Sequence, residues 1–235
     1  MNRSLRRQAA GWLAVFAVVA LVYGVWPTLD LRLADALHDP SSGFIGRDWG
    51  WVLASYHAVP WFGRLLLLGV LLCLWGPRTV RLVSPRARRA ATGLLVALLV
   101  GLTLVVNLTL KETWGRARPH QVSEFGGSRQ YTPPLQPASQ CQRNCSFTSG
   151  HAATGFALIG AGALAGARRR RHWWLLGTAA GAIIGAGRML QGDHFLGDVL
   201  FSWLILWALA WLLRLVWLHL ALRRRAPRLR QDNAT

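Results

Sequence analysis

The chain has 235 residues, of which 53% are hydrophobic and only 15% are charged, against about 25% charged residues in a typical soluble domain. The net charge of +18 would suggest a nucleic-acid partner, but the basic residues lie in short clusters between long apolar runs. The composition therefore excludes a disordered chain, a collagen-like fibre and a disulfide-dense secreted scaffold. It predicts a polytopic membrane protein with no nucleic-acid partner.

Six apolar runs approach the roughly 20 residues that cross a bilayer as a helix. We therefore predict an all-α bundle of six transmembrane helices in a single domain over residues 1–225, followed by a disordered cytoplasmic tail over residues 226–235. The fourth and fifth runs are short and weakly apolar. The six helices are expected at about residues 10–26, 56–75, 90–110, 151–166, 173–190 and 197–220.

The arginine clusters predict the orientation of this bundle, because cytoplasmic loops are enriched in Arg and Lys. Of the 27 basic residues, 17 fall on one side of the six-span arrangement, and eight of the nine acidic residues fall on the other. Both termini are therefore expected in the cytoplasm, with the other loops facing outward. The first run also resembles a cleaved signal peptide. We interpret it as an uncleaved anchor, because its removal would break the charge pattern.

Cys141 and Cys145 lie four residues apart in the longest outward loop. If that loop is periplasmic, it lies in an oxidising compartment, and we predict a disulfide between them. Two free thiols or a metal pair are the alternatives. A zinc site is disfavoured because no further Cys or His is spaced to complete it.

Three polar clusters interrupt the apolar chain, each at the outward end of a predicted span. The first, residues 111–119, contains Arg118 and Lys111, the single lysine of the chain. A compact ammonium retained among so many arginines hints at a specific need for it. The second cluster is residues 148–151 and the third is residues 187–198. The predicted topology brings all three to one face of the membrane.

Several residues of these clusters are suited to binding phosphate. Lys111, Arg118 and Arg188 are cationic donors, and arginine can grip phosphate oxygens with two parallel hydrogen bonds. Ser149 and Gly150 lie at the predicted start of a helix, where free backbone N–H groups attract anions. Each feature also has a structural alternative: the cations as headgroup anchors and Ser149 as a helix cap.

Two histidines add the groups that phosphoryl transfer requires. His194 and Asp198 are four residues apart, which places them on one face of a helix. A carboxylate bonded to one ring nitrogen leaves the other nitrogen free to attack. His151 supplies a second imidazole, with an ordinary pKa of about 6.5, that suits protonation of a leaving alkoxide. A cation-rich site with these groups predicts phosphoryl transfer.

These residues resemble the type 2 phosphatidic acid phosphatase superfamily. Its motifs are Lys, six residues, Arg-Pro; then Pro-Ser-Gly-His; then Ser-Arg, five residues, His, three residues, Asp. The order and spacing fit, with Thr in place of the Pro and Gly in place of the Ser, which puts one hydroxyl contact in doubt. The matching residues are Lys111, Arg118-Pro119, Thr148-Ser149-Gly150-His151, Gly187-Arg188, His194 and Asp198.

The resemblance implies a role for each matching position. His194 would attack phosphorus and form a phosphohistidine, Asp198 would orient His194, and His151 would protonate the leaving group. The resemblance also implies that no metal or other cofactor is needed. The residues that would hold the phosphate oxygens are Lys111, Arg118, Arg188, Ser149 and the Gly150 amide.

The resemblance extends to a substrate class. Residues 114–119, 125–127 and 144–150 are similar to the lipid A phosphatase branch. This implies a phosphorylated membrane lipid as the partner, in a bacterial inner membrane with the site facing the periplasm. Undecaprenyl diphosphate and phosphatidylglycerol phosphate remain open as substrates, and the oligomeric state is not indicated.

Other functions fit parts of the pattern. A phosphotransferase would pass the phosphoryl group to a second lipid instead of water. A non-enzymatic channel or scaffold that binds anionic lipids would leave the spacing of His194 and Asp198 unexplained. Metal-assisted hydrolysis by these two residues and His151 is disfavoured, because the nearby cations would repel a divalent metal.

Overall fold

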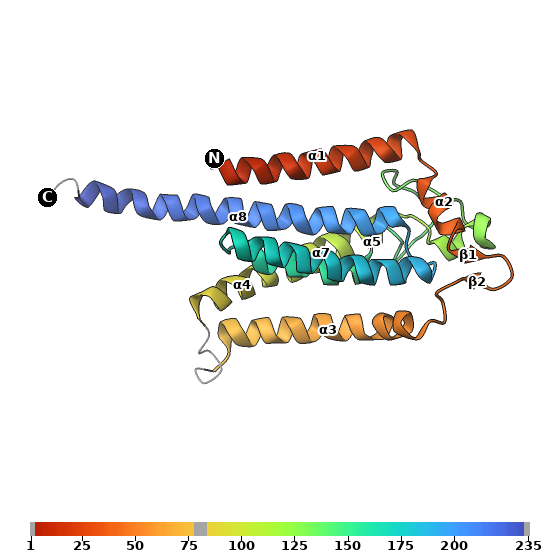
Figure 1. Cartoon of the computed structure of the whole chain (residues 1–235), viewed down its shortest axis with the longest axis horizontal. Coiled ribbons are helices and arrows are strands. Elements are labelled where there is room, and N and C mark those ends of the chain that lie inside the picture. The colour runs from red at the N-terminus through yellow and green to blue at the C-terminus, as the bar shows by residue number, and fades with distance from the viewer. Residues whose placement is uncertain (1–2, 78–83, 233–235) are drawn as a thin grey trace.

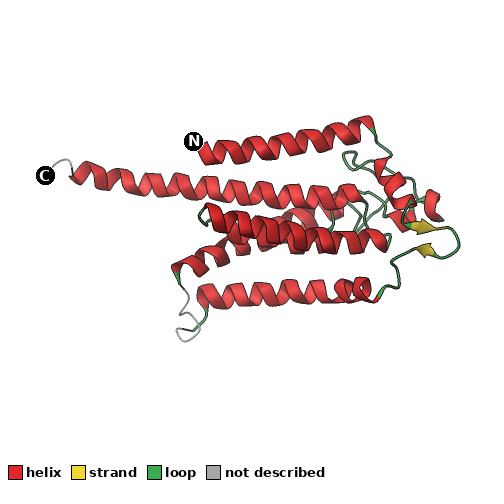
Figure 2. Ribbon diagram, in the orientation of Figure 1, coloured by secondary structure: helices red, strands yellow, loops and turns green. Residues whose placement is uncertain are grey.

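The computed structural model describes residues 3–77 and 84–232, with side chains described as far as Arg223. Long helices lie side by side along one direction, and the short elements and most loops gather at one end (Figures 1 and 2). The start of the first helix and the end of the last lie together at the opposite end (Figure 1). The predicted helical bundle is therefore observed, and its loops are sorted between two ends.

The long elements account for most of the chain. Helix α4 (Pro85–Val96) continues into the π-helical segment η1 (Ala97–Leu110) and the single turn α5 (Lys111–Thr113). The short helix α6 (Gly150–Phe156) continues as the 3₁₀ segment η4 (Ala157–Gly162). The remaining long helices are α1 (Arg3–Val25), α3 (Gly50–Trp75), α7 (Ala167–Leu190) and α8 (Leu196–Asp232).

Four helical stretches are long and apolar enough to cross a membrane. They are Arg3–Val25, Gly50–Trp75, Pro85–Thr113 and Leu196–Arg223. Large apolar side chains such as Leu21, Leu65 and Trp75 are exposed on these helices, and a bilayer would cover them. The chain is thus a polytopic helical membrane protein, as its composition predicts.

The fourth and fifth predicted spans have a different character. The run expected over residues 151–166 forms α6 and η4, of seven and six residues, which is short of the roughly 20 residues that a span needs. Its small apolar residues, among them Ala152, Ala153 and Ala157, are buried inside the protein. Helix α7 has 24 residues but carries four arginines near its start. Neither stretch has the length and apolarity of a free-standing span.

The last helix extends into the predicted tail. The backbone of α8 stays helical through Asp232, and disorder over residues 226–235 stays a prediction. Arg, Leu, Ala and Gln favour the helix, and an already formed helix adds residues more easily than a new one nucleates. Residues 233–235 of the predicted tail lie outside the described residues. So does the stretch 78–83 of the predicted basic loop after the second span.

Glycines allow the central helices to approach each other closely. Gly177, Gly181 and Gly185 lie four residues apart on α7 and all are buried. A Cβ on Gly155 of α6 would lie 2.6 Å from the backbone nitrogen of Gly181, and one on Gly177 would lie 2.7 Å from that of Ile159. Small residues at this spacing let helix backbones touch in a membrane. The contact positions α6, and therefore His151, against α7.

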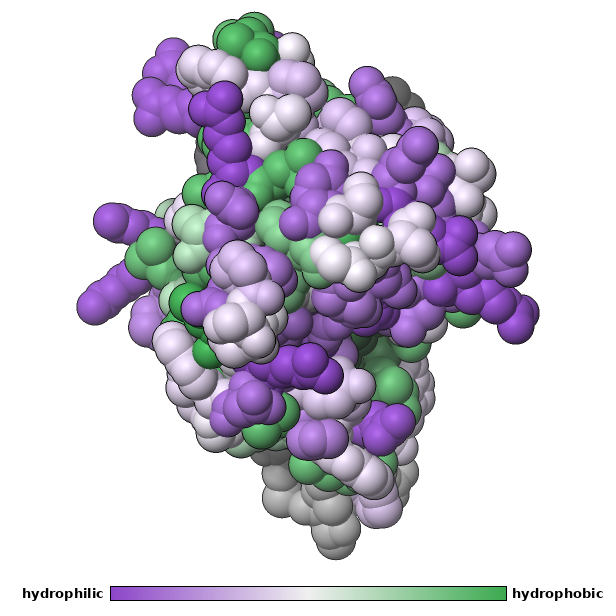
Figure 3. Space-filling model, turned by 90° about the vertical axis from the view of Figure 1, so that its right-hand side faces the viewer, coloured by the Kyte–Doolittle hydropathy of each residue, from purple (hydrophilic) through white to green (hydrophobic). Residues whose placement is uncertain are grey.

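Short elements build the loop end of the molecule. Helix α2 (Leu29–Asp35) leads into the antiparallel strands β1 (His38–Asp39) and β2 (Gly43–Phe44), in which His38 pairs with Phe44. The 3₁₀ turns η2 (Pro119–Gln121) and η3 (Ser123–Phe125) follow α5. Apolar residues of these elements form a small second core around Phe44, Phe125 and Phe195. The surface above it is largely hydrophilic (Figure 3).

The contact between α6 and α7 makes a prediction about stability. Gly155→Ala should lower the free energy of unfolding by about 1–3 kcal/mol, because the added methyl overlaps the α7 backbone. Gly69→Ala in α3 is the matched control, since nothing lies within 4 Å of that position. Thermal unfolding in detergent measures both variants. An unchanged Tm in the Gly155 variant would contradict the close contact.

Candidate functional site

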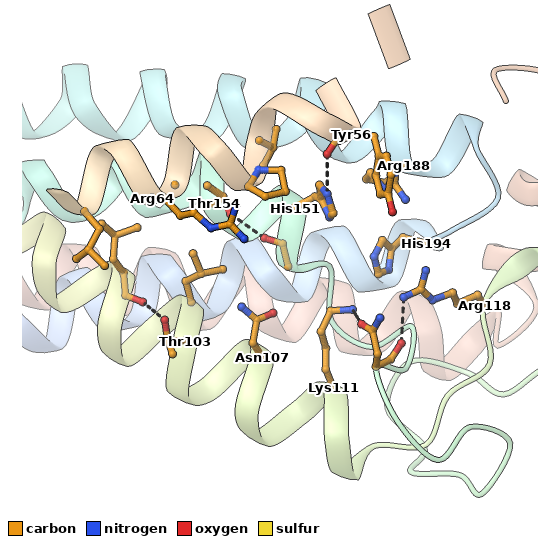
Figure 4. Close-up of a pocket in the computed structure, with 18 residues that line it drawn as sticks. Tyr56, Arg64, Thr103, Asn107, Lys111, Arg118, His151, Thr154, Arg188 and His194 are labelled. Carbon is orange, nitrogen blue, oxygen red and sulfur yellow. Dashed lines mark hydrogen bonds between the residues drawn. The ribbon is translucent and has the colours of Figure 1, made fainter. Parts of the chain in front are cut away.

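A cavity of about 490 Å³ opens between α3, η1, α6 and the end of α7. At one end of the cavity lie the side chains of Lys111, Arg118, His151, Arg188 and His194, which come from separate parts of the chain (Figure 4). Arg64 and Thr103 lie at the opposite end (Figure 4), and the apolar side chains of Val59, Leu67, Leu98 and Leu102 also line the cavity. The three predicted polar clusters therefore meet at one end of a cavity whose lining also includes apolar side chains of α3 and η1.

Two of the predicted phosphate-binding cations share a polar loop residue. The ammonium of Lys111, which is buried, donates to the side-chain oxygen of Asn144 and to the carbonyl of Cys145, both at 3.1 Å. The Arg118 guanidinium donates to the backbone carbonyl of Asn144 at 3.0 Å. Residues 144–145 thus hold both cations at the edge of the cavity, where they face an incoming anion.

Asp193 links the remaining cations. Its carboxylate accepts from Arg118 at 3.2 Å, is paired with the Arg188 guanidinium, and lies 3.4 Å from the ring nitrogen Nδ1 of His120. Arg188 also bonds the side chain of Gln191. One carboxylate among these donors partly neutralises them while the site holds no phosphate. A bound phosphate would compete with Asp193 for the same guanidinium groups.

His194 and Asp198 are adjacent, as their spacing predicts. His194 lies in the short connection between α7 and α8, and Asp198 lies in the first turn of α8. The His194 Nδ1 atom is 3.6 Å from Asp198 Oδ2, which is an ion-pair distance longer than a normal hydrogen bond. With Nδ1 facing Asp198, the other ring nitrogen is the one free to attack.

Arg116 binds the carboxylate of Asp198. Its guanidinium donates to Asp198 Oδ1 at 2.6 Å and to Asp30 Oδ2 at 2.7 Å, and all three side chains have 0% exposure. The Ser146 hydroxyl donates to Asp198 Oδ2 at 2.5 Å. Tyr23 donates its hydroxyl proton to Asp30 at 2.6 Å. The carboxylate that faces His194 is therefore fixed by a buried network.

Burial also sets the protonation of His194. It lowers the pKa of this ring to about 3, from an ordinary value of about 6.5. The Lys111 and Arg118 cations act in the same direction, while Asp198 opposes them. His194 is therefore a neutral imidazole near pH 7, as a nucleophile toward phosphorus must be.

His151 lies on the α3 side of the cavity. Its ring stacks on Tyr56, with centroids 5.3 Å apart, and its Nε2 atom lies 3.3 Å from the Tyr56 carbonyl oxygen. The Arg188 guanidinium covers the Tyr56 ring at 4.5 Å. Tyr56 thus contacts both the second predicted histidine and one cation of the cluster.

Ser149 and Gly150 occupy different positions at the start of α6. The Ser149 hydroxyl accepts from the Ala152 N–H at 3.4 Å as a helix cap, and Ser149 is fully buried. Gly150 lines the cavity, and a Cβ there would lie 2.7 Å from the side-chain oxygen of Asn107. Only Gly150 of this pair faces the cavity, and phosphate binding by Ser149 stays a prediction.

The two loop cysteines form the expected pair. Cys141 and Cys145 are joined by a disulfide, with Cα atoms 5.6 Å apart. Cys145 is buried, and its carbonyl accepts from Lys111. The disulfide therefore closes the small loop that supplies Asn144 to the cation cluster.

Sequence reasoning missed several residues that complete the site. The sequence around Asp30 does not indicate a role in the site. Its partner Arg116 is far away in the sequence, and Asp30 resembles the other acidic residues of the predicted outward loops. Arg116 stood inside the first cluster but was not distinguished from Arg118. Within the described ranges, no three His, Cys, Asp or Glu side chains come together as metal ligands, and independence from metal stays a prediction. The other missed residues are Tyr56, Asn107, Asn144, Ser146 and Asp193.

Comparison with known proteins identifies the family. The model described as the PAP2 superfamily matches residues 90–221, which is more than half of the chain. The chain belongs to the PAP2 superfamily. The match includes all three motif clusters and excludes α1, α2 and α3. In this member, Asp30 of α2 and Tyr56 of α3 nevertheless contact motif residues.

Three relatives carry the same printed name, Lipid A 4'-phosphatase. The protein from Francisella tularensis subsp. novicida is 32% identical over 189 residues, covering 80% of this chain and 85% of the relative. The Rhizobium etli protein is 40% identical over 125 residues, covering 52% of this chain and 47% of the relative. The Rhizobium leguminosarum protein is 40% identical over 111 residues, covering 46% of each. No solved structure gives a significant match.

The buried network predicts a large effect for Arg116. Arg116→Ala leaves Asp30 and Asp198 buried without their cation, and breaking a buried ion pair costs about 3–5 kcal/mol. We expect a strongly lowered Tm in detergent and loss of activity. Arg129→Ala is the control, because Arg129 is an exposed arginine of the same loop region. A wild-type Tm in the Arg116 variant would show that the network does not stabilise the fold.

The depressed pKa of His194 predicts its charge at mildly acidic pH. The ring should remain neutral at pH 5, whereas an ordinary histidine with a pKa of about 6.5 is mostly protonated there. Nitrogen NMR of protein labelled at histidine, with His194→Asn to assign the signal, measures this directly. Half-protonation near pH 6.5 would contradict the effect of burial.

Proposed function

We propose that this PAP2 member removes a phosphate monoester from lipid A at the periplasmic face of a bacterial inner membrane. As a member of this superfamily with membrane-spanning apolar helices, it is a phosphatase that acts on lipid phosphate. The observation that carries the proposal is a neutral, buried His194 beside a fixed Asp198, facing the cavity that Lys111, Arg118 and Arg188 line.

The first step transfers the phosphoryl group to the enzyme. The free nitrogen of His194 attacks phosphorus, a P–N bond forms and the P–O bond to the lipid breaks. Burial and the Arg188 cation lower the pKa of His151 to about 4, and the negative charge of a bound phosphate opposes this shift, so that His151 takes up a proton. His151 gives this proton to the departing oxygen, so the lipid leaves as an alcohol. The phosphorylated ring then carries a positive charge, which the Asp198 carboxylate stabilises. The cations stabilise the oxygens of the phosphoryl group in flight.

The second step returns the enzyme to its starting state. A water attacks the phosphorus of the phosphohistidine, and His151, now neutral, accepts a proton from that water. The P–N bond breaks, orthophosphate leaves and His194 becomes neutral again. Transfer to water, rather than to another lipid, makes the reaction a hydrolysis.

The relatives and the shape of the cavity support lipid A as substrate. All three relatives are named for the 4'-phosphate of lipid A, and we propose the same position here. The cavity combines a cationic end with apolar side chains of α3 and η1, as a lipid with a phosphorylated headgroup requires. The apolar side chains are suited to an acyl chain and the cationic end to the phosphate.

The distribution of charge supports six membrane-crossing segments with both termini in the cytoplasm. The start of α1, the start of α7 and the end of α8 all carry arginine clusters and lie at one end of the bundle (Figure 1). The disulfide and the catalytic cluster lie toward the other end. Positive clusters favour the cytoplasmic side, and a disulfide favours the periplasm. In this arrangement α6 with η4 is a short span enclosed by the other helices, and α7 is a span of 24 residues that exposes Leu175 and Ile183 to the lipid.

Phosphate release from defined lipids tests the proposal. We expect release from lipid A in detergent with a chelator present, and none from His194→Ala, because the nucleophile is absent. His219→Ala is the matched control, since His219 is an exposed histidine of α8 far along the helix from the site. Acid-labile phosphate on the wild-type protein after rapid quenching would mark the phosphohistidine.

Other outcomes would replace the proposal. Release from undecaprenyl diphosphate or phosphatidylglycerol phosphate, but not from lipid A, would reassign the substrate. A newly phosphorylated acceptor lipid in place of free phosphate would identify a transferase. Activity lost on adding the chelator would require a metal, and full activity in His194→Ala would remove the proposed chemistry.

A further inference from the structure

We propose that a second pocket, beyond Tyr56 and Arg188, holds the sugar ring that carries the scissile phosphate. The inference rests on the proposed function and specifies how the enzyme tells a glycolipid phosphate from a glycerolipid phosphate. The pocket has a volume of about 530 Å³ and shares Tyr56 and Arg188 with the catalytic cavity. A ligand with its phosphate in one cavity reaches the other past these two side chains.

Most of the second pocket is built by segments that lie outside the three motifs, and only Arg188, Gln191 and Asp193 of its lining fall within the third motif. The β1–β2 hairpin forms one wall, and the first turns of α3 form another. The residue His120 of η2, Phe125 of η3 and the end of α7 close the remaining sides. None of the hairpin and α3 residues belongs to the stretch matched by the PAP2 superfamily. The pocket is therefore suited to substrate selection rather than to the chemistry that the family shares.

The lining combines rings with planar polar groups. His38, Phe44 and Phe125 form a cluster with centroids 5.0, 5.1 and 5.4 Å apart, and His57 packs on Tyr56 at 4.9 Å. A pyranose presents a face of C–H groups and a rim of hydroxyls. Rings can cover the face while imidazole, amide, carboxylate and guanidinium groups bond the rim.

The charges of the pocket favour a neutral ring over a second phosphate. Arg47 stands next to Asp48, and Arg188 is already paired with Asp193. The two cations are therefore matched by two anions, and the other titratable groups on the walls are histidines and Tyr56. The described lining of the catalytic cavity, by contrast, has four cations, Arg64, Lys111, Arg118 and Arg188, and no carboxylate. A phosphate is better placed among those cations, and a hydroxylated ring in the balanced pocket.

The walls of the second pocket are anchored without a ligand. The Gly46 N–H donates to the Leu190 carbonyl at 3.1 Å, which ties the hairpin to the end of α7. Both the backbone N–H and the ring nitrogen Nδ1 of His120 lie within hydrogen-bond distance of the Gly192 carbonyl, at 3.0 and 2.9 Å. Phe44 is buried against Gly192. A pre-formed pocket loses little entropy when it binds.

The geometry of the proposed attack on phosphorus also places the leaving group beside the second pocket. His194 attacks phosphorus from one side, so the departing oxygen lies on the side of the proton donor, His151. That ring stacks on Tyr56, which is a shared wall of the two cavities. The group attached to the departing oxygen therefore begins beside Tyr56. The acyl chains have a separate path, because the apolar side chains of Leu67, Leu98 and Leu102 line the catalytic cavity where it is bounded by α3 and η1.

Substitutions in the second pocket test the inference. We would compare His57→Ala and Arg47→Ala with the wild type, and use His219→Ala as the matched control. All three side chains are exposed in the unliganded protein, so truncation should leave the fold intact, as the Tm in detergent would verify. The readouts are kcat/KM for lipid A and for phosphatidic acid, and the inhibition constant of orthophosphate, which reports on the catalytic cavity alone.

Each pocket variant should lower kcat/KM for lipid A by about tenfold, the value of one hydrogen bond or ring contact. Phosphatidic acid turnover and inhibition by orthophosphate should stay at the wild-type level. Unchanged kcat/KM for lipid A in both variants would overturn the inference while leaving the proposed function intact. An equal loss for both lipids would also overturn it. No release from lipid A by the wild type would overturn the proposed function, and this inference with it.

Discussion

The arrangement of the site depends on one buried guanidinium shared by two carboxylates. Arg116 joins Asp30 of α2 to Asp198 of α8, so the loop after α5 is fixed to segments from both ends of the chain. Asp198 in turn determines where His194 stands. A buried charge is costly unless each of its hydrogen-bonding groups is satisfied. Here Thr132, Ser146 and Tyr23 supply the remaining bonds, and the network specifies one geometry for the nucleophile.

The cavity above this network concentrates positive charge without leaving the cations free to move. Asn144 and Cys145 hold Lys111, and Asp193 holds Arg118 and Arg188. Groups that are held before the substrate arrives need no reorganisation during phosphoryl transfer, which is where electrostatic catalysis gains most. The same cations oppose protonation of His194. In the proposed mechanism, binding of the phosphate and activation of His194 therefore come from one cluster of charges.

The membrane environment explains why the inner segment formed by α6 and η4 is short and rich in small residues. The outer helices α1, α3 and α8 expose large apolar side chains, so lipid can surround the bundle. The inner segment α6 is enclosed by protein, and Gly155 and Gly181 let its backbone touch α7. Because α6 is in contact with protein rather than lipid, it needs neither the length of a full membrane span nor a strongly apolar surface. His151 and Gly150 can then begin a helix inside the bundle, next to a polar cavity.

The sequence alone was enough to predict the class of the protein, its long helices, its disulfide and six of the residues that line the cavity, namely Lys111, Arg118, Gly150, His151, Arg188 and His194. The length of the apolar runs, the arginine clusters and the spacing within the three motifs are local features of the sequence. They can be recognised without knowledge of the fold. Only the tertiary structure decided that α6 is an inner segment, that Ser149 caps a helix, and that Asp30 and Tyr56 complete the site. These features depend on contacts between segments distant in sequence, such as Arg116 with Asp30. A buried ion pair or a cavity wall that joins distant segments produces no periodic pattern of residues in the sequence, so the sequence alone does not predict it.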